Sequence, residues 1–271
     1  MSYINNSRIF YLDTHDRISG EHENCTLKVE IPPTESFDRV CVLSCVIPRS
    51  YYLVEAPYNT FILRENGVDT TITIAEGNYN FSSFKAYLQN LLTTSSSQGW
   101  IYTITTPNTI SQPSTGKYTF TVNTGGFMLN PSFIMPANTK VHEQLGFEPN
   151  STNNFVGWSL TSRNVVKFIL EDTLYIHSDI VGSIDNDILQ EVFTSGSTDF
   201  SSIKFQNNTP QEYSKPLSTG NNNVYRFTLT DEDGNTIKLN GHNIVITLMI
   251  YKKNDLDKMQ KEYIKYQLLK K

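Results

Sequence analysis

Hydrophobic and polar residues alternate along much of this chain, as they do in a β-strand that buries one face and leaves the other in water. The pattern is clearest between Phe227 and Asn254. There, FTLT and TIKL flank Asp233-Gly234, a pair that favours a tight hairpin turn, and IVITLMIY follows as the nearly continuous apolar run of a central strand. This region predicts a hairpin and a buried strand near the end of a β domain.

Similar alternation recurs along the chain, and turn-forming residues separate the segments that carry it. Asn66-Gly67 lies between two of these segments and predicts a second hairpin. Residues 188–193 fit either a strand or a helix. The other predicted strands are 26–31, 39–47, 60–65, 70–74, 101–105, 117–122, 165–170, 173–181 and 202–206. About ten candidate strands are too many for one small sheet, so we expect a two-sheet sandwich.

The pattern changes to a helical period in two internal places. Apolar residues recur at spacings of three and four between Phe84 and Leu92, which predicts an amphipathic helix over 82–93 with Ser82 as its N-cap. TKVHEQLG suggests a short helix that stops at Gly146. The long helix is expected to pack on a sheet.

A third helix is predicted at the C-terminal end. Asn254 can cap it, acidic residues occupy its first turn and Lys270-Lys271 its last, which suits the helix dipole at both ends. Its narrow apolar seam consists of Leu256, Met259, Tyr263 and Tyr266. Two interpretations stay open: the helix lies against its own domain, or it reaches a neighbouring subunit or the interior of an assembly.

Composition favours a large β-rich core over a nucleic-acid-binding surface. Of the 271 residues, 38% are hydrophobic and 12% are aromatic. Residues 252–271 contain seven Lys and three acidic residues, a net charge of +4. Because the whole chain has a net charge of −5, residues 1–251 carry −9. Binding to phosphates needs clustered Lys and Arg, so any contact with a genome is expected to be weak and to involve the basic C-terminal segment.

The sequence contains no arrangement that predicts catalysis, a cofactor or a metal site. Cys25, Cys41 and Cys45 form no CxxC pair and are expected to be free, buried thiols. His177 and Asp179 share one face of a predicted strand, but two such groups are more simply a hydrogen-bonded histidine than a site. The acidic run DEDGN between two strands predicts a hairpin turn rather than a calcium loop.

We therefore expect a protein that is not an enzyme. No apolar run approaches the roughly 20 residues of a membrane helix, and the first residues lack the pattern of a secretion signal. The sequence predicts no membrane span.

Several segments, in order, resemble one family. They are SYYLVEAPYNTFIL (50–63), GNYNFSSFKAYLQNLL (77–92), LGFEPN (145–150), LYIHSDIV (174–181), DILQEVF (187–193), YSKPL (213–217), FTLTDEDGNTIKLNG and ITLMIYKKN. From about residue 26 to residue 254 the chain resembles the penton, or minor capsid, proteins of virophages and of Maverick/Polinton-type double-stranded DNA elements.

This resemblance implies an all-β fold, a single jelly-roll β-sandwich with one amphipathic helix inserted and a C-terminal helix. It also implies a structural protein of the virion, assembled inside the infected host cell, in which a homopentamer closes each vertex of an icosahedral shell beside a double-jelly-roll major capsid protein. We expect an N-terminal arm (1–25), the jelly roll (26–253) with an insertion within 75–160, and a basic C-terminal helix or tail (254–271).

Subunit contacts are predicted from an aromatic cluster between two strands. Interfaces favour Tyr and Arg at their centres, and the alternative is that these tyrosines belong to the core. The predicted interface residues of this cluster are Arg49, Tyr51, Tyr52 and Tyr58, and Tyr263 and Tyr266 of the C-terminal helix are added to them. The arm and the tail are expected to contact neighbouring subunits or the genome-facing side.

The alternative function is a carbohydrate- or receptor-binding jelly-roll module. Such a module would display surface Trp or Tyr side chains for stacking on a sugar. Only Trp100 and Trp158 are available, and neither lies in an obvious aromatic row.

Overall fold

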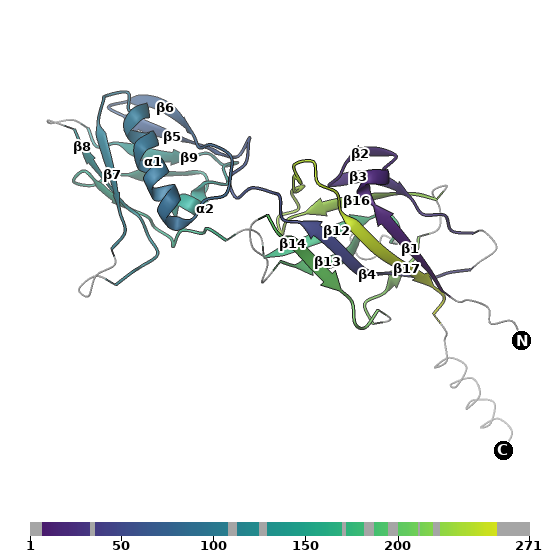
Figure 1. The fold of residues 1–271 in the computed structure, drawn as a ribbon. Coiled ribbons are helices and arrows are strands. Elements are labelled where there is room, and N and C mark those ends of the chain that lie inside the picture. Colours follow the sequence, from purple (N-terminus) through teal and green to yellow (C-terminus); the bar gives the residue numbers. More distant parts are fainter. Residues whose placement is uncertain are drawn as a thin grey trace, which may run out of the picture. The chain divides into compact units, whose positions relative to one another are not determined.

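The computed structural model divides the chain into two compact units (Figure 1). Unit 1 comprises residues 1–51 and 171–271, and unit 2 comprises residues 52–170. Strands make up 44% of the structure and helices 10%, which confirms the all-β, jelly-roll-like class. The structure describes residues 7–32, 36–107, 113–124, 129–169, 172–181, 187–194, 200–210, 212–218 and 223–253.

Unit 1 consists of two antiparallel sheets. The first has the order β1 (Ser7–Asp13), β17 (Val245–Tyr251), β4 (Arg39–Pro48), β14 (Ser202–Gln206), with β15 (Lys215–Pro216) also paired to β4. The second has the order β13 (Ile188–Phe193), β12 (Thr173–Ser178), β16 (Val224–Thr230), β3 (Asn24–Lys28), β2 (Ser19–Glu21). A short 3-10 helix, Thr14–Asp16, follows β1. Side chains from both sheets, Phe227 and Ile246 among them, line one small internal void, so the sheets face each other.

The core of unit 1 follows from the alternation seen in sequence. Ile246, Leu248 and Ile250 of β17 are buried. On the neighbouring strand β4, the buried residues Val42 and Val40 pair with Leu248 and Ile250. Because β17 lies between β1 and β4, both of its edges are hydrogen-bonded. The run IVITLMIY is thus the central strand that its composition predicts.

The expected N-terminal arm needs correction. The described part of residues 1–25 supplies β1, β2 and the start of β3 within the sheets of its own chain. β1 pairs along its whole length with β17, from Ser7 opposite Tyr251 to Asp13 opposite Val245. The partner strand of β1 is more than 200 residues away in the chain, and a local pattern does not reveal such a pairing, so this segment resembles an arm in sequence.

The structure confirms the predicted turn at Asp233-Gly234 but not the second strand of the predicted hairpin. Gly234 has φ +81°, and its N–H donates to the Asp231 carbonyl at 3.2 Å. The predicted second strand, TIKL, forms a single bridge at Thr236. It cannot extend a ladder beside β16, because β12 and β3 already occupy both edges of that strand.

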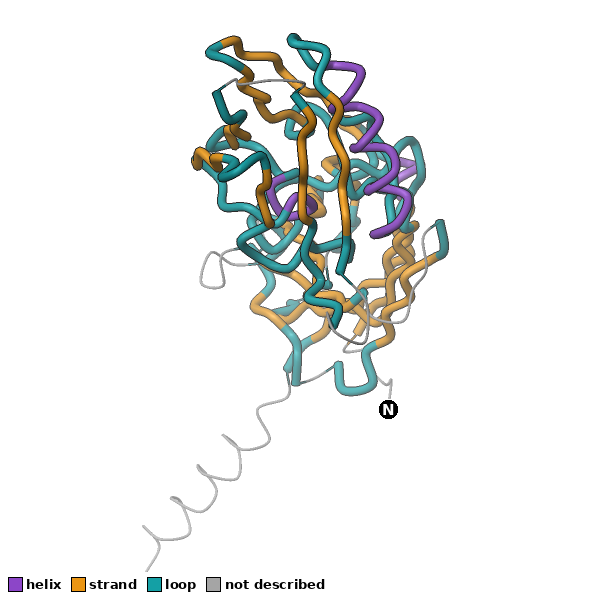
Figure 2. The backbone as a smooth tube through the Cα atoms, turned by 90° about the vertical axis from the view of Figure 1, so that its left-hand side faces the viewer, coloured by secondary structure: helices purple, strands orange, loops and turns teal. Residues whose placement is uncertain are grey.

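Unit 2 contains two smaller antiparallel sheets and two helices. One sheet has the order β10 (Ser151–Asn154), β9 (Ser132–Met135), β5 (Thr60–Glu65), β6 (Val68–Thr73). The other has the order β11 (Ser159–Thr161), β8 (Thr119–Asn123), β7 (Ile101–Thr105). Helix α1 (Phe81–Ser95) packs along β7 and β6 (Figure 1), and Figure 2 shows this long helix in purple beside strands in orange. Helix α2 (His142–Leu145) ends at Gly146, whose φ is +73°.

Helix α1 confirms the predicted period and corrects its start. Phe84, Leu88 and Leu92 are buried on one face. The N-cap is Asn80 rather than Ser82: its side-chain oxygen accepts from the backbone N–H groups of Ser82 and Ser83. A capping box forms because the Ser83 hydroxyl reaches back to the Asn80 backbone.

Aromatic rings dominate the core of unit 2. Phe133 lies at its centre, with ring centroids 5.0 Å from Phe120, 5.2 Å from Phe155 and 5.4 Å from Phe61, all edge-to-face. The carboxylate of Glu65 is fully buried beside this core and accepts hydrogen bonds from Tyr102 and from the Ser96–Gln98 segment after α1. The charge is therefore well satisfied, as a buried carboxylate requires.

Two further sequence predictions have different outcomes. Residues 188–193, ambiguous in sequence, form β13, whereas the predicted strand 165–170 has no strand among its described residues. Val166 donates instead to the Gly116 carbonyl, and Lys167 to that of Glu143, so consecutive residues of this segment bind two different partners rather than one strand.

The predicted C-terminal helix, 254–271, lies outside the described residues. The limits 26–253 for one domain, with an insertion within 75–160, stay predictions. Among the described residues, no helix has the length and apolar character needed to cross a membrane.

Candidate functional site

The predicted interface residues differ in exposure. Arg49 and Tyr51 are 8% and 2% exposed, whereas Tyr52 and Tyr58 are half-buried. The Tyr58 carbonyl accepts from the Lys140 backbone N–H at 2.9 Å, and the Lys140 ammonium lies 5.7 Å from the centre of the tyrosine ring. Of the four predicted interface residues that the structure describes, Tyr52 and Tyr58 are therefore the ones that offer side-chain surface to a partner. Tyr263 and Tyr266 lie outside the described residues.

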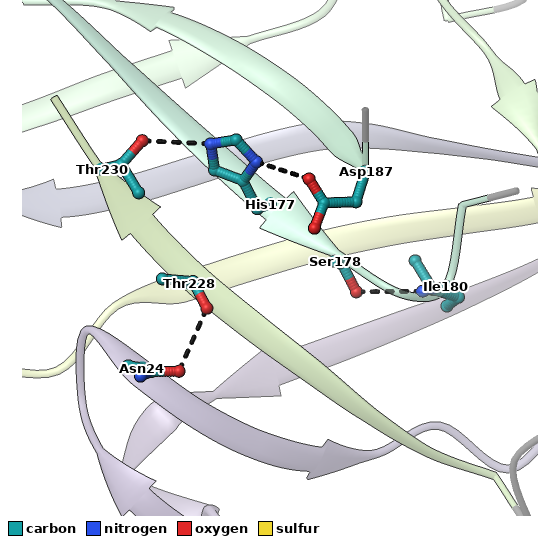
Figure 3. Close-up of polar contacts among 7 residues, drawn as sticks. All are labelled: Asn24, His177, Ser178, Ile180, Asp187, Thr228 and Thr230. Carbon is teal, nitrogen blue, oxygen red and sulfur yellow. Dashed lines mark hydrogen bonds and ion pairs between the residues drawn. The ribbon is translucent and has the colours of Figure 1, made fainter. Parts of the chain in front are cut away.

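His177 has a different partner from the one suggested by sequence. Its Nδ1 lies 2.8 Å from Oδ1 of Asp187, and its Nε2 lies 3.0 Å from Oγ1 of Thr230 (Figure 3). Asp179 instead accepts from the backbone N–H of Arg226. The order hydroxyl, imidazole, carboxylate is that of an acid–base relay, but Thr230 is only 6% exposed and lies within a sheet. The arrangement joins β12, β16 and the residue before β13, and we assign it a structural role.

The remaining chemistry-bearing residues give no site. The three thiols are free and buried, as predicted, and burial raises the pKa of Cys25 and Cys41 to about 11 and that of Cys45 to about 12. Thiols held protonated in this way are poor nucleophiles and ligands. Within the part of the chain that the structure describes, no group of three or more His, Cys, Asp or Glu could hold a metal ion.

One sheet of unit 1 exposes apolar side chains on its outer face. Tyr11 of β1 is 80% exposed and Ile9 is 50% exposed. Val245 of β17 and Val46 of β4 are paired across the sheet, and each is 38% exposed. Paired and alternate residues share a face, so these four side chains define one surface, which we call the β1 face.

The second surface feature is a pocket of about 720 Å³ in unit 1. It lies beside β13 and β14, the end strands of the two sheets, and residues 207–209, Tyr213 and Lys215 complete its lining. Phe193 and Tyr213 in its lining are 64% and 62% exposed. The residues of this pocket come from four separate segments, so no local pattern in the sequence predicts it.

Comparison with known proteins gives one structural neighbour to report. No family model matches the chain, and no curated protein matches it. The crystal structure of the selenomethionine-labelled mavirus penton protein is similar over 91% of this chain and 100% of that one, with 13% sequence identity and a TM-score of 0.42. That protein is of the kind that the sequence segments resemble.

Proposed function

We propose that this chain is a structural protein of an icosahedral virus shell and that five copies close a vertex. The observation that carries the proposal is the β1 face, with support from the ordered sequence segments that resemble penton proteins between residues 26 and 254. The virion is then its location, with assembly inside the infected host cell.

The β1 face has the character of a surface that a neighbouring subunit covers. β1 is an end strand, and end strands of monomeric proteins are usually protected by charge, proline or a covering segment. β1 carries Arg8 and Asp13 near its ends, but between them Ile9 and Tyr11 point apolar side chains outward. Burying exposed apolar surface is the main favourable contribution to association, and tyrosine is enriched at interfaces.

A fivefold ring needs two different surfaces on each copy, because a head-to-tail contact closes into a ring. We assign the β1 face to one side of this contact. Tyr52 and Tyr58 retain surface for a further contact, and Tyr263 and Tyr266 belong to the basic segment proposed to reach neighbouring subunits or, weakly, the genome. A double-jelly-roll major capsid protein is the proposed partner around each vertex.

The test replaces Tyr11 and Val245 with Lys in one variant. Charged side chains on the β1 face would have to lose water in the contact, so we expect about a tenfold or greater loss of this chain from particles when it is co-expressed with the major capsid protein. Quantitative mass spectrometry of purified particles measures that content. Circular dichroism should remain unchanged, since both side chains point outward.

Val156→Lys is the matched control, because Val156 is 80% exposed but belongs to unit 2. It should enter particles at the wild-type level. If the Tyr11/Val245 variant is folded and enters particles as well as the wild type does, the β1 face is not a subunit contact.

A further inference from the structure

We propose that the pocket between β13 and β14 binds a neutral saccharide. This is a binding function beyond the structural role. Pockets for small ligands typically enclose about 300–1,000 Å³ and combine apolar walls with a few polar groups. The present pocket has about 720 Å³ and both kinds of wall.

The apolar wall consists of aromatic rings. Tyr175, Phe193, Phe205 and Tyr213 come from three strands and the segment before β15, and all four line the pocket. Phe193 and Tyr213 keep more than half of their surface in solvent, which is unusual for rings of this size in a protein with a large core. A pyranose ring has one face of C–H groups, and this face packs on an aromatic ring while the hydroxyls stay polar.

The polar wall consists mainly of amides. Gln190, Gln206, Asn207 and Asn208 line the pocket, and an amide side chain both donates and accepts hydrogen bonds. Sugar hydroxyls need the same combination. Asn207 is held in place, since its Nδ2 donates to the Val42 carbonyl at 3.2 Å and its Oδ1 accepts from the Thr209 N–H at 2.9 Å. The segment that carries Gln206, Asn207 and Asn208 is thus anchored to β4.

Backbone groups of β13 add to this wall. The Thr194 N–H donates to the Asp172 carbonyl, so the next pair inward, Phe193 opposite Thr173, is a non-hydrogen-bonded pair of the antiparallel ladder. The N–H and C=O of Phe193 therefore point away from β12. Those of Glu191, two residues earlier, do the same, and the Glu191 carbonyl accepts from Nε2 of Gln190 at 2.6 Å. They face the side of β13 where no described strand pairs.

The charge of the pocket argues against ionic ligands. Glu191 and Lys215 are the charged residues of the lining, and they have opposite signs. A phosphate-bearing ligand would need clustered cations, and a metal ion would need several carboxylates. Burial, followed by the negative charges of Glu191 and Glu232, raises the pKa of Tyr175, so its hydroxyl remains a neutral donor.

An added peptide strand fits less well. The β12–β13 pairing contains a register shift between Ile176 and His177, opposite the start of β13. Irregularities of this kind interrupt the regular edge that strand addition requires. The protruding rings of Phe193 and Tyr213 also suit a ligand that stacks rather than one that extends the sheet.

This aromatic surface is not the one considered from sequence. Trp100 is 3% exposed, and Trp158 packs against the core of unit 2. The pocket belongs to unit 1, where β14 and β1 are opposite ends of one sheet. A substitution in the pocket can therefore be tested without altering the β1 face.

The experiment is saturation-transfer NMR on the full-length protein. The probes are neutral di- and trisaccharides of glucose, galactose, mannose and N-acetylglucosamine, with a capped hexapeptide of alternating Thr and Val as the competing ligand class. We expect saturation transfer to at least one saccharide. Tyr213→Ala should weaken its binding about tenfold, and Tyr213→Phe should preserve it, because the stacking ring remains.

Tyr11→Ala is the control, since it removes a tyrosine that is even more exposed, 80% against 62% for Tyr213, from the opposite end of the sheet. It should bind the saccharide normally. The proposal is overturned if no saccharide receives saturation, if only the hexapeptide does, or if folded Tyr213→Ala binds as tightly as the wild type. Incorporation into particles should be unaffected by Tyr213→Ala, so this result and the structural role are judged separately.

Discussion

The two units of this protein are built on different principles. Unit 2 comes from one continuous segment, residues 52–170, and its core is a cluster of phenylalanine and tyrosine rings. Unit 1 combines two segments from opposite ends of the chain, and its core consists mainly of aliphatic side chains with three buried thiols. Both proposed surfaces, the β1 face and the pocket, belong to unit 1.

The difference concerns how far apart in sequence the contacts lie. The strands of unit 2 pair mostly with near neighbours, as β5 does with β6 and β7 with β8. In unit 1, Ser7 pairs with Tyr251 and Lys28 with Val224. Long-range pairs cost more chain entropy before they are formed. We therefore expect unit 2 to form first, and unit 1 to require both ends of the chain.

The chain carries a separate probe for each unit. Both tryptophans, Trp100 and Trp158, belong to unit 2, and all three cysteines belong to unit 1. Tryptophan fluorescence should follow the unfolding of unit 2, and thiol labelling the opening of unit 1. The comparison between the units can thus be tested in one intact protein.

The largest expected effect is that of Phe133→Ala. Phe133 is fully buried at the centre of the aromatic cluster, so the substitution should lower the free energy of unfolding of unit 2 by about 3–5 kcal/mol. A urea titration followed by tryptophan fluorescence measures the change. Val156→Ala, at an exposed site of the same unit, should have almost no effect. If Phe133→Ala also destabilised unit 1 by the same amount, as measured by faster thiol labelling, the two units would unfold together.

A slightly smaller effect is expected in unit 1 from Leu248→Ala. Leu248 is fully buried in β17 between β1 and β4, and its truncation should cost about 2–5 kcal/mol. Thiol labelling in native buffer should become faster while the tryptophan transition stays in place. Thr247→Ala, on the outer face of the same strand, serves as the control. A shift of the tryptophan transition by Leu248→Ala would contradict the separation of the units.

The smallest effect is a difference in alkaline stability. The thiol pKa values are raised from 9.0 to about 11 for Cys25 and Cys41 and to about 12 for Cys45. Above pH 9 the unfolded chain releases these protons and the folded chain keeps them, so stability present below pH 9 is lost as the pH rises toward 11. The loss should reach about 1 kcal/mol for each thiol by pH 10.

Unit 2 should respond at higher pH. Burial raises the pKa of Tyr102 and Tyr118 above an ordinary value of 10.0, so their contribution begins to fall only above pH 10. Urea titrations at pH 8, 9 and 10, followed by circular dichroism and by tryptophan fluorescence, separate the two responses. The predicted difference between the units is wrong if the urea midpoint of the tryptophan transition falls between pH 9 and pH 10 as much as the midpoint of the transition that circular dichroism follows in unit 1.

Local pattern was sufficient where an element is stabilised by its neighbours in sequence. Asn66 and Gly67 adopt positive φ in the hairpin between β5 and β6, and the period between Phe84 and Leu92 gives the buried face of α1. Local pattern failed where the partner strand is distant in sequence or where both edges of the neighbouring strand are already paired. β1 was not predicted, and TIKL was expected to be a strand although both edges of β16 are taken.

Functional residues were harder to predict than strands. Among the predicted interface residues, Arg49 and Tyr51 are buried in the single chain, a property that depends on packing rather than composition. His177 was recognised as a polar group in a strand, but its partner Asp187 lies after a turn and not at Asp179. Neither the β1 face nor the pocket has a sequence motif.

By itself, the sequence determined the β class, most of the strands, the long helix, the free thiols and the resemblance to penton proteins, because alternation, turn residues and helical periods are local properties. Only the tertiary structure decided that the chain forms two units, that its first and last strands meet, and which apolar side chains remain exposed. These depend on contacts between residues far apart in the chain, and a local pattern carries no information about them.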